Sequence, residues 1–578
     1  MTPSPESEQT RRWVVLAIVA GAAFRLVHYG LNPSLTLDDA MLSFNLASRS
    51  WAGLAHPLAF QQTAPIGFLW ASRAVTLLGG LNEFALRAVP VLAGVATPYG
   101  VWLLARRLVS AGAAVVAAFF AALSPILIQY SISVKPYETD ALFAVGVALA
   151  TLTTLDRPVR RNWVALGGVG VAALLFSTPA VFVLAGCGLA LALTLRRRAL
   201  LPLTLVGTAW IALFAVLYWT VTRAEAVSPY MQWFWDHKFL TPAVVLAEPG
   251  RAWDIVQRLP TQVFTGDAPQ LIALILCWFA AVAGAWHVSR TQGTRVWVLL
   301  GPIAFALAAS MFRRYPVAPR LFLFAAPFVA VILAAGVERG RMSLAAGAGA
   351  LRVGFEALVV LWLITIGVLS ANTSRLWAPP TRPLIQELRR QRVDHEPLYV
   401  FSGAVPAWLL YTTHWDDPSD TSFAMTVAAA ERWDGNAFQN AASRGHAVAD
   451  TEGGRLIGVQ GGFPVIIGLS TGIAWREGQW LSQLQPDSGW AEREAGRIDT
   501  VTDSTCWLLF SQLARREAPL LMHALAARHG QAILEQGSRG ALLYRVRFTR
   551  GGGGGAVSSP RDDRRLGDAV PDMKHTAR

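Results

Sequence analysis

Long apolar segments are the feature that most constrains how this chain can fold. Segments long enough to cross a bilayer, about twenty residues each, lie near residues 12–30, 85–105, 111–129, 138–155, 162–177, 179–195, 200–222, 269–288, 295–311, 320–337 and 353–371. Only 15% of the 578 residues are charged, whereas a soluble protein has about a quarter. We therefore predict an α-helical multi-pass membrane protein with about eleven transmembrane helices.

The basic residues indicate how these segments are oriented. The net charge of +13 does not indicate a nucleic-acid partner, because much of it lies in short connections between the apolar segments. Arginines follow every second segment, as in the run 196–198, and cytoplasmic loops are enriched in such residues. This alternation predicts a cytoplasmic N-terminus. It also predicts that the loop 31–84, with its short amphipathic helices, and the region after 372 lie outside.

The composition changes after residue 372. Short apolar runs at 397–403, 455–461, 506–513 and 541–548 read as strands, and segments 405–415 and 517–530 read as helices. Such alternation is typical of an α/β domain. We predict a transmembrane domain at 1–372, an extracytoplasmic α/β domain at 373–549 and a disordered tail at 550–578, where glycines and charged residues predominate.

One stretch of the first outer loop, LTLDDAMLSFNLASRS at 35–50, carries two adjacent carboxylates. Asp38 and Asp39 open a predicted amphipathic helix beside a membrane segment, which makes them candidates for catalysis. A structural interpretation is also open, because Thr36 and Asp39 have the spacing of a helix-capping box. That box uses Asp39 and leaves Asp38 without a structural role.

Other ionisable residues gather in or near the outer loops. Lys135, Tyr137 and Asp140 lie in VKPYETD, Arg320 ends RRYPVAPR, and Arg25 lies in the outer half of the first segment. Charged groups at or near a membrane span are costly and usually functional. Acids together with Lys and Arg suggest a phosphate-bearing substrate, because the cations can stabilise a leaving phosphate.

Each of these residues also has a simpler interpretation. Lys135 can extend its ammonium toward the interface, Asp140 can cap the fourth helix, and Arg320 can pair with an acid for structural reasons only. The aromatic run around Trp235 is typical of an interfacial belt.

Several motifs, taken in chain order, resemble a known family. They are LTLDDAMLSFNL, QTAPIGFLWASRAV, SVKPYETDA, RYPVAPRLFLFAAPF, PDSGWAEREAGRI and CWLLFSQL. Their order is similar to that in bacterial GT-C glycosyltransferases, the relatives of protein O-mannosyltransferases and of the lipid A aminoarabinose transferase. The resemblance covers most of the chain.

The resemblance implies an inverting hexosyl- or pentosyltransferase of the bacterial inner membrane. Asp38 would activate an acceptor hydroxyl or amine, with Asp39 beside it, and the sugar would come from a polyprenyl-phosphate donor. Lys135 and Asp140 would lie near the donor, and Arg320 would assist binding. From their place in or near the outer loops, we expect Tyr137 and Arg25 to contribute to substrate binding as well. The extracytoplasmic acceptor can be a lipid, a glycan or a protein. No cofactor is implied with certainty, and a divalent metal is possible because some members use one.

Two other classes of protein remain as alternatives. A transporter or flippase of lipid-linked sugars would more often show inverted repeats and ionisable groups near the middle of the membrane. A membrane-anchored sensor, in which the domain after 372 does the work, would not need so many membrane segments.

Overall fold

The structure is a computed structural model. It describes residues 5–261, 271–344, 349–371, 379–393, 395–428, 457–468, 474–476, 479–481, 488–502, 504–512, 516–538 and 540–549. The predicted tail 550–578 lies outside these residues. The chain forms two units, and three segments contribute to each. The first contains residues 1–33, 49–58 and 62–377, and the second contains residues 34–48, 59–61 and 378–578.

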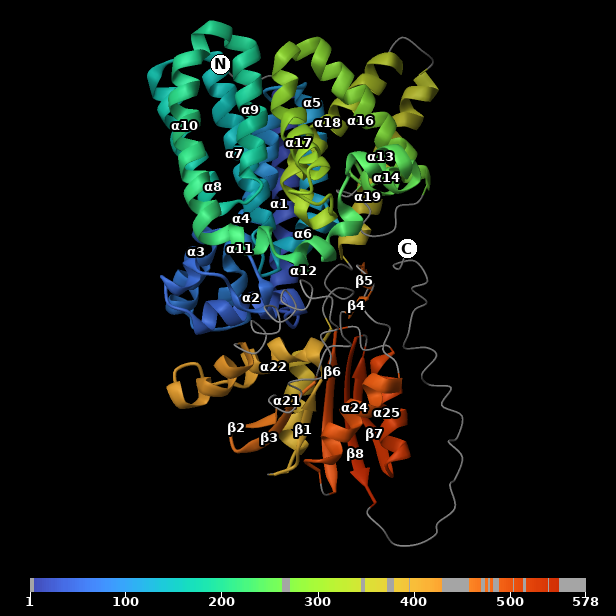
Figure 1. Ribbon diagram of the computed structural model, residues 1–578. Helices are drawn as coiled ribbons and strands as arrows, with labels where there is room; N and C mark the ends of the chain where they lie inside the picture. Colours follow the sequence, from blue (N-terminus) through green and yellow to red (C-terminus); the bar gives the residue numbers. More distant parts are fainter. Residues whose placement is uncertain are drawn as a thin grey trace. The chain divides into compact units, whose positions relative to one another are not determined.

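The first unit is a bundle of helices (Figure 1). Apolar segments form helices because a backbone in hydrocarbon must satisfy its N–H and C=O groups internally. Every predicted segment coincides with a helix or a broken pair of helices. They are α1 (Pro5–Gly30), α4 (Glu83–Ala105), α5 (Ala111–Leu123) with α6 (Pro125–Ser131), α7 (Tyr137–Asp156), α8 (Arg160–Phe176), α9 (Ala180–Leu195), α10 (Leu200–Leu217), α16 (Leu271–Gln292), α17 (Trp297–Met311), α18 (Ala326–Leu344) and α19 (Gly349–Ala371).

Seven helical segments among the described residues are long and apolar enough to cross a membrane. There are eight if α5 and α6, which meet at 51°, count as one span. Two of the seven, Ala180–Thr222 and Leu271–Met311, contain 43 and 41 residues, about twice the length of one crossing. Each holds two helices joined by a short 3-10 helix, η3 (Arg196–Ala199) or η6 (Gly293–Val296). The multi-pass class is confirmed, and the total of eleven crossings stays a prediction.

Shorter elements connect these helices. They are η1 (Gly53–Ala55), α3 (Ile66–Gly79), the π-helix η4 (Tyr218–Thr222), α11 (Arg223–Ala226), α12 (Pro229–Phe234), η5 (Asp236–Lys238), α13 (Pro242–Ala247), α14 (Pro249–Val256) and η7 (Pro319–Ala325). The last of them, η7, packs against α7 and thereby brings the loop before α18 to the beginning of the fourth apolar segment.

The second unit contains a six-stranded sheet in the order β2-β3-β1-β6-β8-β7. Its strands are β1 (Leu398–Val400), β2 (Ile457–Gln460), β3 (Phe463–Ile467), β6 (Thr505–Ser511), β7 (Gly530–Ser538) and β8 (Ala541–Phe548). β1 runs parallel to β3 and β6, and the other pairs are antiparallel. A separate hairpin joins β4 (Ala474–Arg476) to β5 (Gln479–Leu481). The predicted α/β class is confirmed.

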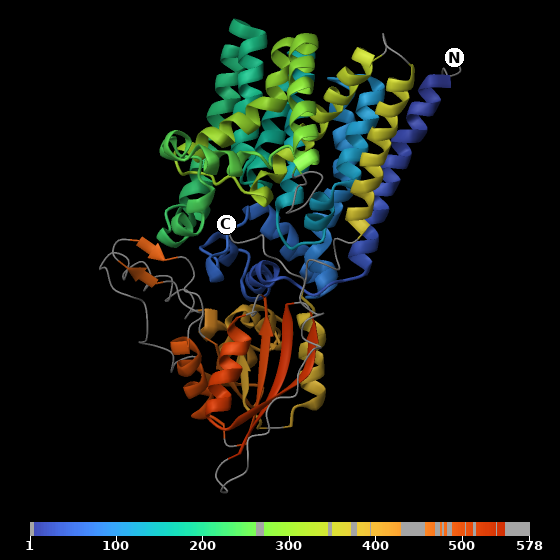
Figure 2. The same cartoon turned by 90° about the vertical axis from the view of Figure 1, so that its right-hand side faces the viewer.

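The two faces of this sheet carry separate cores, because successive side chains of a strand point to opposite sides. Leu398 and Val400 belong to one core, which includes residues of α21 (Thr381–Gln391) and α22 (Val405–Thr412). Tyr399 belongs to the other, with residues of α24 (Ser488–Asp499) and α25 (Glu517–Ala527). Figure 2 shows helices on both sides of the sheet.

Two short elements of the first loop complete the core that contains α21 and α22. They are α2 (Leu37–Ser48) and η2 (Ala59–Gln61), and both belong to the same unit as the sheet. The predicted boundary at residue 372 did not include them in that domain. The predicted helix itself is present, and it begins two residues later than the stretch in which we expected it.

Candidate active site

The two aspartates open α2 and have different environments. The N–H of Asp39 donates to the Thr36 hydroxyl at 3.3 Å, and the N–H of Thr36 donates to the Asp39 carboxylate at 3.4 Å. Asp39 is 1% exposed. This reciprocal pair of hydrogen bonds is a capping box, so Asp39 has the structural role that the sequence left open. Asp38 lies in the same first turn and is partly exposed.

Lys135 lies in the turn between α6 and α7 in the first unit. Its side chain is only 6% exposed, and its Nζ donates to Oε1 of Gln62 at 2.6 Å. A buried ammonium is expensive unless polar groups surround it. Its placement just before the beginning of α7 therefore suits a cation that meets an anionic ligand.

Tyr137 and Asp140 lie in the first turn of α7. The Tyr137 ring packs edge-on against Tyr130, with 4.9 Å between the ring centroids. Asp140 is buried and hydrogen-bonded to Ser177, and its Oδ1 has no hydrogen-bond partner. An unsatisfied buried oxygen is costly, which makes Asp140 a strong candidate for contact with a ligand.

Tyr315 joins this group, although the sequence analysis did not select it. Its hydroxyl donates to the carbonyl of Leu321 in η7 at 2.6 Å. Burial raises the pKa of Tyr315 well above its ordinary value, and the nearby Asp140 and Tyr137 act in the same direction. Its place in RRYPVAPR, beside the predicted Arg320, was the signal that could have identified it.

Arg320 lies in η7, and its guanidinium stacks on the ring of Trp235 at 5.1 Å from the centroid. The aromatic loop that we interpreted as an interfacial belt therefore supports a candidate binding residue. Arg313, by contrast, pairs with Asp236 at 2.7 Å, as expected of an ordinary residue that anchors a loop at the membrane surface.

Arg25 is fully buried among helices. Its guanidinium donates to the carbonyls of Ala122 at 2.9 Å and Ala121 at 3.1 Å, and it lies 3.8 Å from the carboxylate of Glu138. Glu138 is also fully buried, and it accepts a hydrogen bond from Thr97 at 3.4 Å. This geometry favours a structural role, and the predicted contact of Arg25 with substrate stays a prediction. The sequence analysis quoted Glu138 in its motif but assigned it no role.

The first unit thus brings several predicted residues to one region. Tyr137 and Asp140 on α7 lie together with Tyr315, and η7, which carries Arg320, packs against α7. Lys135 immediately precedes α7. Asp38 and Asp39 belong to the second unit and are described with it.

A divalent metal was left open by the sequence. Among the described residues, no three His, Cys, Asp or Glu side chains are grouped so that they could hold a metal ion together.

A comparison with models of protein families finds one match in this chain. Residues 63–219 match the model of a family described as dolichyl-phosphate-mannose-protein mannosyltransferase. The resemblance to GT-C glycosyltransferases is confirmed. The matched segment includes Lys135, Tyr137 and Asp140. No curated protein sequence matches the chain.

Several solved structures also match the chain. ArnT from Cupriavidus metallidurans matches in its apo state, with a TM-score of 0.48, 14% identity, and coverage of 93% of this chain and 98% of that one. Its complex with undecaprenyl phosphate matches with a TM-score of 0.49, 12% identity, and coverage of 92% and 98%.

The archaeal oligosaccharyltransferase AglB from Archaeoglobus fulgidus, in complex with an inhibitory peptide and a dolichol-phosphate, matches with a TM-score of 0.44 and 15% identity. The match covers 69% of this chain and 63% of that chain. This chain therefore spans less than two thirds of the length of that oligosaccharyltransferase.

Proposed function

We propose that the protein is an integral-membrane glycosyltransferase that moves a sugar from a polyprenyl-phosphate donor to an acceptor on the extracytoplasmic side. The observation that carries this proposal is the buried group of ionisable side chains at the beginning of α7, within the segment matched by the mannosyltransferase family model. Ionisable residues that are buried within transmembrane segments are costly and usually functional.

In this reaction Asp38 is the general base. Its carboxylate takes a proton from the acceptor hydroxyl or amine, and the acceptor oxygen or nitrogen attacks the anomeric carbon of the sugar. The bond from that carbon to the phosphate oxygen breaks, and its electron pair leaves with the polyprenyl phosphate. Attack opposite the leaving group inverts the anomeric configuration. A positioned base of this kind contributes about 10²–10⁴-fold in rate.

Cations stabilise the phosphate that leaves. Lys135 acts as a point charge, whereas the guanidinium of Arg320 can hold two phosphate oxygens at once. Trp235 keeps the Arg320 fork in place through the stacking described above. Asp140, whose Oδ1 has no hydrogen-bond partner, accepts a hydrogen bond from a sugar hydroxyl.

The distribution of arginines supports a cytoplasmic N-terminus and an extracytoplasmic α/β domain, and the resemblance to bacterial GT-C enzymes implies the inner membrane. A reporter protein fused after residue 375 tests this topology. Activity of a reporter that works only outside the cytoplasm is the expected result, and a cytoplasmic signal would contradict the orientation.

Transfer itself is tested with the purified protein and a set of radiolabelled polyprenyl-phosphate sugars. Asp38→Asn and Asp39→Asn form a matched pair, since both remove one carboxylate charge from the same helix turn. We expect Asp38→Asn to lose at least 10²-fold in rate and Asp39→Asn to lose mainly stability. A folded Asp38→Asn variant that transfers sugar at the wild-type rate would refute the assignment of the base. Movement of the donor from one leaflet of a vesicle membrane to the other, without sugar transfer, would favour a flippase.

A further inference from the structure

The helix that carries Asp38 is part of the hydrophobic core of the α/β domain. Phe44 of α2 is 1% exposed and belongs to the same buried cluster as Trp408 and Leu409 of α22. Met41, one turn earlier, packs against this cluster. A helix of twelve residues is marginal in isolation and depends on such packing. The domain therefore supplies much of the stability of α2.

Two polar contacts anchor the chain just before α2. The N–H of Leu35 donates to the hydroxyl of Tyr411 at 3.2 Å, although these residues are 376 positions apart. The N–H of Arg382, in α21, donates to the Ser34 hydroxyl at 3.2 Å. Both contacts hold the residues that immediately precede the capping box, so they constrain where the helix begins.

A second segment of the same loop supports the other side of α2. Asn45 accepts a hydrogen bond from the N–H of Ala59 at 2.8 Å and donates to the carbonyl of Ala59 at 3.2 Å. Phe60 then packs edge-on against Phe44 at 5.2 Å. Phe60 and Gln61 have φ values of 59° and 50°, a backbone conformation that residues other than glycine rarely adopt. The domain tolerates this strain to place the Phe60 ring.

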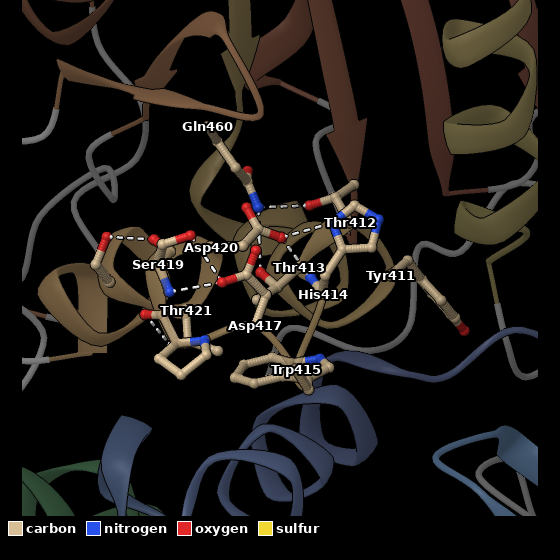
Figure 3. A network of polar contacts seen from close by, with 12 residues as sticks. Tyr411, Thr412, Thr413, His414, Trp415, Asp417, Ser419, Asp420, Thr421 and Gln460 are labelled. Carbon is tan, nitrogen blue, oxygen red and sulfur yellow. Dashed lines mark hydrogen bonds and ion pairs between the residues drawn. The ribbon is translucent and has the colours of Figure 1, made fainter.

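The turn after α22 places Trp415 against the ring of Phe44. Trp415 packs edge-on against Phe44 with 5.4 Å between centroids. Figure 3 shows how polar contacts shape this turn: Asp420 accepts hydrogen bonds from both the backbone N–H and the ring of His414. Gln460, from β2, donates to the Thr412 hydroxyl at 2.8 Å. The turn is therefore held from two sides, and the position of Trp415 depends on the sheet.

We propose that the α/β domain positions the catalytic helix, with Tyr411 and Trp415 as the positioning residues for Asp38. The proposal rests on the proposed function, because it gives these contacts a role in sugar transfer. A general base must lie within hydrogen-bond reach of the proton it removes. Misplacement by about 1 Å can reduce the rate about 10²-fold. The domain thus belongs to the catalytic apparatus, whatever acceptor the enzyme uses.

A purely structural role for these contacts makes a different prediction. If the packing only stabilises the domain, a tryptophan that packs against the core on either face of the sheet can be removed with a loss of activity that follows its burial, and the loss should be larger for the buried Trp490 than for the partly buried Trp415. Trp490 offers the matched comparison. It is buried in the core on the other face, where it packs edge-on against Phe401 at 6.5 Å.

The experiment compares Trp415→Leu with Trp490→Leu in the full-length protein. Hydrogen exchange of residues 37–48 and the kcat and KM for the lipid-linked donor are measured for each variant below its unfolding temperature. For Trp415→Leu we expect faster exchange in α2 and a fall in kcat of at least about tenfold, with the donor KM within about threefold. For Trp490→Leu we expect unchanged exchange in α2 and a kcat within about twofold.

A milder variant, Tyr411→Phe, removes only the hydroxyl that accepts from Leu35. We expect a smaller fall in kcat and faster exchange at the start of α2. Unchanged exchange in α2 in both Trp415→Leu and Tyr411→Phe would overturn the proposal, as would an equal loss of kcat in Trp415→Leu and Trp490→Leu. If the wild-type protein transfers no sugar from any donor, the proposed function fails instead, and exchange alone still tests the support of α2 by the domain.

Discussion

Substitution of Arg25 by methionine tests the most deeply buried ion pair of the transmembrane unit. Both Arg25 and Glu138 are fully buried, with 3.8 Å between Nη2 and the carboxylate. Loss of one member of such a pair costs about 3–5 kcal/mol, because the other charge remains in a medium of low polarity. Gly94 shows how closely the guanidinium fits, since a Cβ at that position would come within 3.0 Å of Arg25 Nε.

A second contribution comes from the break between α5 and α6. In a continuous helix the carbonyl of Ala121 would accept a hydrogen bond from residue 125, but Pro125 has no N–H. Arg25 Nη2 supplies that hydrogen bond at 3.1 Å. An unsatisfied buried carbonyl costs about 1–3 kcal/mol. The two effects share one side chain and are not additive, so we expect a total loss of about 3–5 kcal/mol.

The assay is thermal unfolding of the purified protein in detergent at a fixed scan rate. At about 2 °C per kcal/mol for a large domain, the apparent Tm should fall by roughly 6–10 °C. The double variant Arg25→Met/Glu138→Gln should be more stable than Arg25→Met alone, because it no longer buries an unpaired carboxylate. Arg25→Lys should be intermediate, since an ammonium keeps the charge but not the planar fork.

A different result would support the prediction made from the sequence, in which Arg25 binds the substrate. If Arg25→Met keeps the wild-type Tm but raises the KM for the donor, the structural interpretation is refuted. If the double variant is no more stable than Arg25→Met, the ion pair contributes nothing to the loss.

Three further predictions concern packing, pH and donor binding. Gly284→Ala should destabilise the transmembrane unit, because the new Cβ would clash with the carbonyl oxygen of Ile332 in α18. Gly207→Ala is the control, since a Cβ there meets open space. The apparent Tm should fall in the first variant and stay unchanged in the second. Burial and the adjacent Glu494 raise the pKa of Tyr399 well above its ordinary value in the folded protein. In the unfolded chain the same hydroxyl ionises near about pH 10. The free energy of unfolding should therefore fall as the pH rises above about 10. This fall in stability should be shallower in Tyr399→Phe, as denaturation at pH 9 and 11 would show. Lys135→Met should raise the donor KM by roughly 10–150-fold, the equivalent of one lost charge-assisted hydrogen bond, and an unchanged KM would contradict its contact with the phosphate.

Much of the architecture followed from properties of neighbouring residues. Hydropathy located the membrane helices, since each must bury a continuous apolar length. The turn between β2 and β3 is similarly local, because Gly461 and Gly462 have φ values of 59° and 87°, which glycine adopts without steric cost. The capping box of α2 was equally local, since Thr36 and Asp39 are three residues apart. Each of these features depends on residues that lie close to one another in the sequence.

Contacts between distant segments were beyond the reach of such patterns. The sequence indicated that α2 exists and carries two acids, but only the tertiary structure revealed that Tyr411 and Trp415 support it. Likewise, the motif around Glu138 did not show that Arg25 would be its partner. Side-chain pairing across helices depends on how those helices pack. Many residues along the chain carry a suitable charge, so the sequence does not indicate which of them becomes the partner. The sequence by itself determined which segments enter the membrane and which acids could act, and the tertiary structure decided which distant residues hold them.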